Sequence, residues 1–136
     1  MRVAAVTLCL VALGCGIPEH GPMMEPGQDC LACHGADSKR HWTAAGTVFP
    51  TPDAKLDEGL QGVEVSLTDS KNRTIRMTTN GAGNFYTAET LFFPVNVAIK
   101  FKDVEMKMAD RPPQGACNSC HTGPSGPTGI GRIHVP

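Results

Sequence analysis

The chain carries the frame Cys-x-x-Cys-His twice, as CLACH at residues 30–34 and as CNSCH at residues 117–121. The residues between the two frames, 35–116, contain no cysteine. Each frame places two thiols and one imidazole close together in the sequence, so a single short turn must present all three. A fold for this chain therefore has to hold two such turns. The length between them leaves open whether the turns meet in space.

Residues 44–109 alternate apolar and polar side chains in short runs. In one of them Val63, Val65 and Leu67 alternate with polar residues. Gly, Asn, Asp and Pro separate the runs, and this pattern predicts antiparallel strands with one buried face. About six such runs predict a mainly β fold, a small antiparallel β-sandwich or an open barrel. The runs are AAGTVF, GVEVSLTD, RTIRMTT, NFYTA, PVNVAIKF and DVEMKM.

The N-terminus has the pattern of an export signal. Arg2 precedes an apolar run, residues 3–13, that is too short to span a bilayer as a helix. The run ends in ALGC, whose small residues directly before Cys15 resemble a bacterial lipoprotein signal, in which the cysteine is lipidated. The alternative is an ordinary secretory signal that is cut near Gly16. Both signals predict an exported protein, and no later apolar run is long enough for a membrane-spanning helix.

The spacing inside each frame suits the covalent attachment of haem c. Two cysteines separated by two residues can reach one edge of a porphyrin from one turn, and the histidine that follows is placed to ligate the iron. Two Cys-x-x-Cys pairs could instead hold a structural zinc ion, which needs no histidine after both pairs. In an oxidising compartment the four cysteines could also form two disulfides. A thioredoxin-like redox pair would need a βαβ setting, which the pattern lacks.

Through CLACH and CNSCH the sequence resembles the c-type multihaem cytochromes. The resemblance implies two covalently bound haem c groups, with their irons as the only metal. The cofactor-binding residues would be those of the two frames: Cys30, Cys33 and the proximal iron ligand His34 for the first haem, and Cys117, Cys120 and the proximal ligand His121 for the second.

The middle of the chain resembles the carboxypeptidase regulatory-like group of exported β-sandwich domains. The residues that carry this resemblance are GVEVSLTD, RMTTNGAGNFYT and FPVNVAIKF. That group is generally non-catalytic, so the resemblance implies a scaffold or binding module without an active site.

Together these patterns divide the chain into five segments. They are a lipoprotein-type signal peptide at 1–14, a Pro/Gly tether at 15–29, a first haem c segment at 30–43, a β-sandwich domain at 44–109 and a second haem c segment at 110–136.

A haem that only transfers electrons usually has a second protein ligand on the far side of its iron. His41 and His134 each follow one of the frames, and we expect them to be the distal ligands. The other candidates are His20, Met23 and Met24 in the tether. Two further methionines, Met106 and Met108, are in phase with Val104 on an expected strand, which favours packing in the core.

The formal net charge of the chain is −1, and no basic stripe marks it as a nucleic-acid binder. We therefore expect a non-enzymatic electron-transfer protein of the bacterial cell envelope, periplasmic or anchored to the outer membrane through a lipid, with redox proteins as partners. Two alternatives remain open. One is a dihaem peroxidase-like enzyme, and the other is a subunit of a redox complex whose β domain docks a partner.

Overall fold

The computed structural model describes residues 23–123 and 129–136, and these residues form a mainly β structure. The signal segment, Cys15 and His20 lie outside the described residues. Two single-turn helices and seven strands are present in the described part: α1 (Cys30–Cys33), β1 (Ala44–Phe49), β2 (Glu64–Thr68), β3 (Thr74–Thr78), β4 (Asn84–Thr87), β5 (Asn96–Phe101), β6 (Val104–Lys107), α2 (Cys117–Cys120) and β7 (Ile133–His134). The prediction of a small β-sandwich is confirmed.

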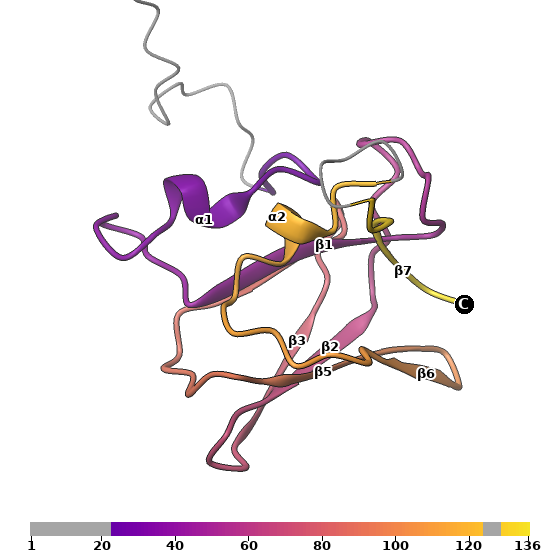
Figure 1. Ribbon diagram of the computed structural model, residues 1–136. Helices are drawn as coiled ribbons and strands as arrows, with labels where there is room; N and C mark the ends of the chain where they lie inside the picture. The colour runs from indigo at the N-terminus through magenta and orange to yellow at the C-terminus, as the bar shows by residue number, and fades with distance from the viewer. Residues whose placement is uncertain (1–22, 124–128) are drawn as a thin grey trace, which may run out of the picture.

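The strands form two sheets that pack face to face (Figure 1). The larger sheet has the order β3-β2-β5-β6, and every pair in it is antiparallel. The smaller sheet has the order β4-β1-β7, in which β1 is antiparallel to β4 but parallel to β7. The parallel pair was not expected. It forms because the chain comes back to β1 only after the whole larger sheet, and such a long connection permits a parallel strand.

Apolar residues from both sheets fill the space between them. One cluster of buried side chains contains Val48, Val63, Val65, Phe85, Ile99 and Val135, and a second contains Ala44, Leu67, Ile75, Leu91 and Val95. Val135 follows β7, so the last residues of the chain complete the core. The structural sandwich therefore extends beyond the predicted segment 44–109.

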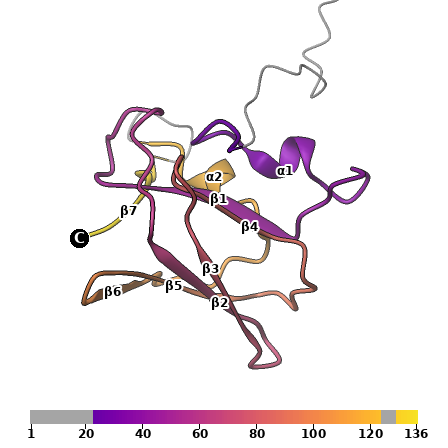
Figure 2. The same cartoon turned by 180° about the vertical axis from the view of Figure 1, so that it is seen from behind.

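All six residues of β1 are buried, whereas β2 and β3 alternate between buried and exposed positions. A strand is buried on alternate residues when one of its faces meets solvent, and on every residue when both faces are covered. The larger sheet lies on one side of β1, and both α1 and α2 lie on the other (Figures 1 and 2). The two Cys-x-x-Cys-His frames thus form the outer layer over β1.

Two details of the sequence prediction can be compared with the core. Met106 is partly buried and packs against the first cluster, as predicted. The same prediction is wrong for Met108, whose residue is 39% exposed because β6 is an edge strand that ends at Lys107.

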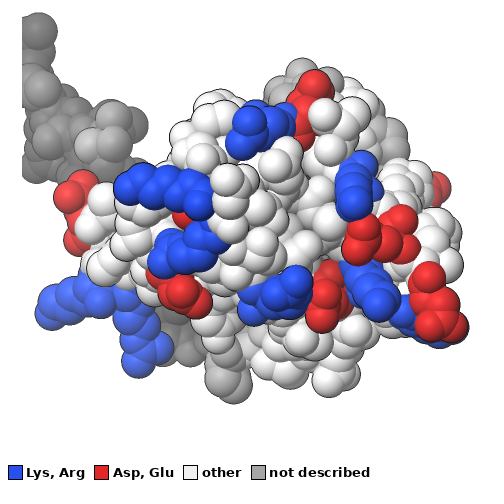
Figure 3. All heavy atoms as spheres, turned by 90° about the horizontal axis from the view of Figure 1, so that it is seen from below, with Lys and Arg blue, Asp and Glu red and all other residues white. Residues whose placement is uncertain are grey.

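The surface below the sandwich is of mixed charge. Figure 3 shows Lys and Arg interspersed with Asp and Glu over the face seen from below. Ion pairs of the larger sheet include Arg76 with Glu64 and Lys107 with Glu105. No helix within the described residues has the length and hydrophobicity that a membrane crossing requires.

Candidate functional site

Both frames fold into the same local structure. In each, one helical turn runs from the first cysteine to the second, and the backbone N–H of the histidine donates to the carbonyl of the first cysteine, at 2.8 Å for His34 and 3.0 Å for His121. Residues i, i+3 and i+4 of a helical turn lie on one face. The turn therefore presents both cysteines and the histidine on the same side, which is the arrangement that haem c attachment needs.

The two turns lie next to each other over β1, although they are far apart in the sequence (Figure 1). The pKa of the Cys117 thiol is raised to about 12, first because the thiol is buried and then because of the nearby Cys30. Burial, followed by the charge of Asp29, also raises the pKa of Cys30. The tertiary structure thus brings the two predicted sites together.

Small residues of β1 allow this approach. Gly46 lies under the second frame, where an added Cβ would stand 2.9 Å from the Cβ of Cys117 and 2.7 Å from the Phe85 ring. Both distances are shorter than real Cβ contacts, so a larger residue would push α2 away from the strand. Ala45 forms a bridge with Ala116 just before the frame, and its N–H donates to the Gly115 carbonyl at 3.0 Å.

Asn118 occupies one of the two x positions of the second Cys-x-x-Cys-His frame, and its side chain joins three parts of the chain. Its Oδ1 accepts from the backbone N–H of Thr47 on β1 at 3.0 Å. Its Nδ2 donates to the Gln28 carbonyl, directly before the first frame, at 2.8 Å, and to the Thr47 hydroxyl at 3.0 Å. Asn118 is 2% exposed and Thr47 is fully buried, so the two bonds between these residues form out of contact with water. A single amide side chain therefore holds both frames to the same strand.

The Thr47 hydroxyl extends this network to the tether. It accepts a second bond from the Gly27 N–H at 2.8 Å and donates its proton to Oδ1 of the buried Asn84 at 2.6 Å. The Asn84 amide donates in turn to the Met23 carbonyl at 2.8 Å and to the Met24 carbonyl at 3.3 Å. The part of the predicted tether that the structure describes is thus fixed to β1 and β4.

Each frame histidine is anchored through one ring nitrogen. His34 Nδ1 lies 2.8 Å from the Arg40 carbonyl, and His121 Nδ1 lies 2.9 Å from the Gly131 carbonyl. A carbonyl oxygen can only accept, so Nδ1 carries the proton in both rings and Nε2 presents a lone pair. Metal-ligating histidines are commonly oriented in this way.

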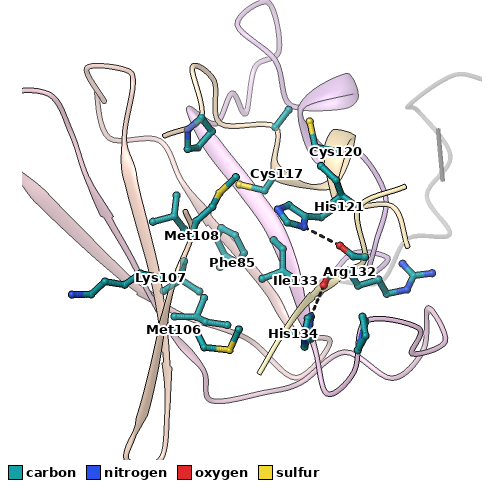
Figure 4. Close-up of a pocket in the computed structure, with 18 of the residues that line it drawn as sticks. Phe85, Met106, Lys107, Met108, Cys117, Cys120, His121, Arg132, Ile133 and His134 are labelled. Carbon is teal, nitrogen blue, oxygen red and sulfur yellow. Dashed lines mark hydrogen bonds between the residues drawn. The ribbon is translucent and has the colours of Figure 1, made fainter. Parts of the chain in front are cut away.

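A cavity of about 430 Å³ lies between the second frame and the larger sheet. Its volume falls in the range of ligand and cofactor sites. Most of its walls are apolar, and Figure 4 shows His121 and Cys117 facing Phe85, Ile133 and the methionines of the β6 region. The residues labelled there are Phe85, Met106, Lys107, Met108, Cys117, Cys120, His121, Arg132, Ile133 and His134.

The first frame borders a different kind of space. A hollow of about 660 Å³ lies beside it, and charged residues such as Glu25, Asp29, Lys39 and Arg40 form part of its wall. Cys30, Cys33, His34, Met24 and Trp42 also border it. The surroundings of the first frame are therefore more polar than those of the second.

The residues of the frames fit the attachment of haem c. Each frame has a histidine whose Nε2 is available and two cysteines on the same face of a turn, both of them reduced thiols in the second frame, which an apolar cavity adjoins. Cys33 is disulfide-bonded in the structure, and a thioether at this position requires its reduced thiol. Within residues 23–123 and 129–136, no group of three or more His, Cys, Asp and Glu side chains is close enough to hold a metal ion.

The predicted distal ligands are placed differently. His134 borders the same cavity as His121, and its Nδ1 lies 2.9 Å from the Arg132 carbonyl (Figure 4). His41 is exposed and borders neither space. Of the two tether methionines, Met24 borders the hollow of the first frame, whereas Met23 is 50% exposed.

No pattern in the sequence indicated the structural role of Asn118 and Thr47. Both are polar residues at positions where the frame and the strand pattern specify nothing, so only their burial reveals them. Nor did any pattern connect Trp42 with His34, although their rings stack at a centroid distance of 3.8 Å.

Comparison of the chain with family models, with curated proteins and with solved structures found no match.

Replacing Asn118 by alanine should destabilise the protein because it leaves the buried Thr47 N–H without a partner and removes the bond to the Gln28 carbonyl. We expect a loss of at least about 2 kcal/mol in the free energy of unfolding. Urea denaturation of the mature protein measures it. Ser119→Ala in the same frame is the control, since the Ser119 hydroxyl bonds mainly within its own turn. Equal losses for the two variants would contradict the role of Asn118.

Proposed function

We propose that this protein is an exported, lipid-anchored dihaem c-type cytochrome that transfers electrons at the bacterial cell envelope. One observation carries the proposal. In each of the two Cys-x-x-Cys-His turns, both cysteines and the histidine lie on one face of the turn. The Nδ1 of each histidine is held by a backbone carbonyl. Bound haem would supply one-electron exchange between ferric and ferrous iron.

The chain's own residues would bind and orient the two haems. Cys30 and Cys33 would attach the first and Cys117 and Cys120 the second, while the anchored imidazoles would keep Nε2 directed at the iron. The Arg40 and Gly131 carbonyls would also raise the basicity of these imidazoles, as partners of metal-ligating histidines do. The apolar walls beside the second frame would exclude water from one porphyrin face.

The neighbouring turns support electron exchange between the two haems within one chain. Asn118 bonds both to Thr47 on β1 and to the Gln28 carbonyl near the first frame, so one side chain ties the two frames to the same strand. Electron transfer slows steeply with distance, so two adjacent porphyrins would form one conducting unit. The β-sandwich would be the scaffold that sets their separation, and no catalytic residue is proposed in it.

A second function is supported by the surroundings of the first frame. Among the described residues that border its hollow, His34 is the only histidine. A first haem without a distal ligand would bind small molecules, which is the property that a peroxidase-like enzyme needs. Cyanide or carbon monoxide titration of the isolated protein distinguishes the two functions, because a six-coordinate pair of haems would bind neither ligand.

The first prediction from this proposal concerns the number of haems. Protein matured in a host that attaches haem c should carry two haems per chain by pyridine haemochrome assay and intact mass. Cys30→Ser with Cys33→Ser should leave one haem, and so should Cys117→Ser with Cys120→Ser, because each frame serves one porphyrin. Bound zinc, two disulfides or unreacted thiols in the wild-type protein would refute the cytochrome proposal.

The second prediction concerns the distal ligand of the second haem. His134→Ala should convert one of the two haems from low spin to high spin while both stay attached, since His134 borders the cavity of His121. Electron paramagnetic resonance measures the spin state. His41→Ala is the comparison, and the same conversion there would assign His41 to the other iron. A different outcome is that neither histidine variant changes the spectrum, while Met106→Leu or Met108→Leu removes a sulfur-to-iron absorption band. In that case the distal ligand is a methionine thioether, and the reduction potential of that haem is higher than with two histidine ligands.

The third prediction concerns anchoring. If Cys15 is lipidated, Cys15→Ser should move the protein from the membrane fraction to the soluble fraction, because acyl chains supply the membrane affinity. Cell fractionation and the mass of the mature N-terminus measure this. A soluble wild-type protein that begins at Gly16 or later would instead identify an ordinary secretory signal.

A further inference from the structure

Three aromatic rings form a continuous stack that ends at the first frame. The rings of His34 and Trp42 are 3.8 Å apart at their centroids with an interplanar angle of 17°. The rings of Trp42 and Tyr86 are 4.2 Å apart with an angle of 14°. His34 and Trp42 are partly buried, and Tyr86 is 48% exposed. The stack therefore connects solvent with the imidazole that would ligate the first iron.

The backbone holds this stack in place. The Trp42 N–H donates to the His34 carbonyl at 2.8 Å, so the loop between the two residues closes on itself. On the other side, the Thr43 N–H donates to the Thr87 carbonyl at 2.8 Å. Tyr86 pairs with Ala45 in the register of β1 and β4. Tyr86 thus stands on β4, whereas Trp42 and His34 belong to the loop that runs from α1 to β1.

The second frame lacks this feature. Within the part of the chain that the structure describes, no aromatic ring stacks on His121, which is held through the Gly131 carbonyl and faces the cavity. Anchoring of Nδ1 is common to both frames, so it does not require the stack. Packing alone explains why Trp42 lies on Tyr86, since such pairs add stability. It does not explain why the stack continues onto the one side chain that would contact iron.

We propose that the stack of Tyr86, Trp42 and His34 is the route by which a one-electron redox protein exchanges electrons with the first haem. This inference rests on the proposed function. Bound haem would supply a one-electron acceptor at His34, and one electron from the reduced centre of the partner would reach it through the three rings. No bond forms or breaks and no proton moves. The stacked rings provide contact between orbitals from the surface to the ligand and stay in their closed-shell state.

The same contacts make Trp42 a positioning residue for His34. Its ring covers one face of the imidazole, and the Arg40 carbonyl holds Nδ1, so the plane of the ligand is defined by two groups. Loss of the Trp42 ring should therefore alter the orientation of the imidazole as well as the path. Rate and potential must be measured together to separate these effects.

A photoactive ruthenium complex attached to an introduced cysteine tests the route without knowledge of the partner. Ala88→Cys places the label beside Tyr86, because residues 86 and 88 are both exposed and lie on the same face of an extended chain. Glu105→Cys on β6 places a control label on the other sheet. Flash-induced reduction of haem is followed by absorbance in the dihaem protein, with haem count and midpoint potentials determined for each variant.

With the label at position 88, Trp42→Leu and Tyr86→Leu should each slow haem reduction, because each removes one ring and interrupts the stack. Trp42→Phe and Tyr86→Phe should restore most of the rate, because each keeps a ring. With the label at position 105, the rates should not change.

If Trp42→Leu does not fold or does not acquire both haems, Tyr86→Leu alone tests the route. Tyr86 is exposed and does not touch His34 directly, so its replacement should leave haem attachment unchanged. Unchanged rates in Tyr86→Leu, with two haems attached and unaltered potentials, would overturn the route. A rate loss that follows entirely from a shifted potential would overturn it too and leave Trp42 a positioning role only. Absence of covalent haem in the wild-type protein would instead refute the proposed function.

Discussion

The edge of β1 that faces away from β4 has to be completed by other parts of the chain. An open edge exposes backbone N–H and C=O groups that must find partners. Ala45 meets Gly115, Thr47 meets the Asn118 side chain, and Val48 and Phe49 meet β7. The second frame therefore takes the place of a strand along half of this edge. Asn118 also bonds to the Gln28 carbonyl, so the side chain that completes the sheet edge also holds the first frame beside the second.

With both frames held to β1, a small domain could carry two large cofactors on one side. Covalent attachment removes the need to enclose each porphyrin fully, so the frames can remain on an outer surface. The β-sandwich then has to supply a rigid support for them. Its core joins residues from both sheets and from the C-terminus, and β1 lies between this core and the frames. A shift of β1 would change the distance between the proposed haems, which makes the strand more sensitive to substitution than its small residues suggest.

Much of the fold could be predicted because its signals are local. Alternation of apolar and polar residues identifies β2, β3 and β5, and the frames predict the short turns of α1 and α2. The two residues of β7 have no periodic pattern, so their parallel pairing with β1 could not be seen. The alternation pattern also predicted a buried side chain where the structure has an exposed one. Met108 is in phase with Val104, but it lies just beyond an edge strand and is exposed.

Residue type and spacing alone predict the candidate site, because they decide which atoms one turn can present. They single out the four cysteines and the two frame histidines, with His41 and His134 as the expected distal ligands. Three relations come from the folded chain instead: the frames are neighbours, His134 shares a cavity with His121, and His41 borders neither space. A fourth is that Tyr86 and Trp42 extend His34 to the surface. These relations depend on strand register and on buried hydrogen bonds between distant residues, and no local pattern of side chains encodes them.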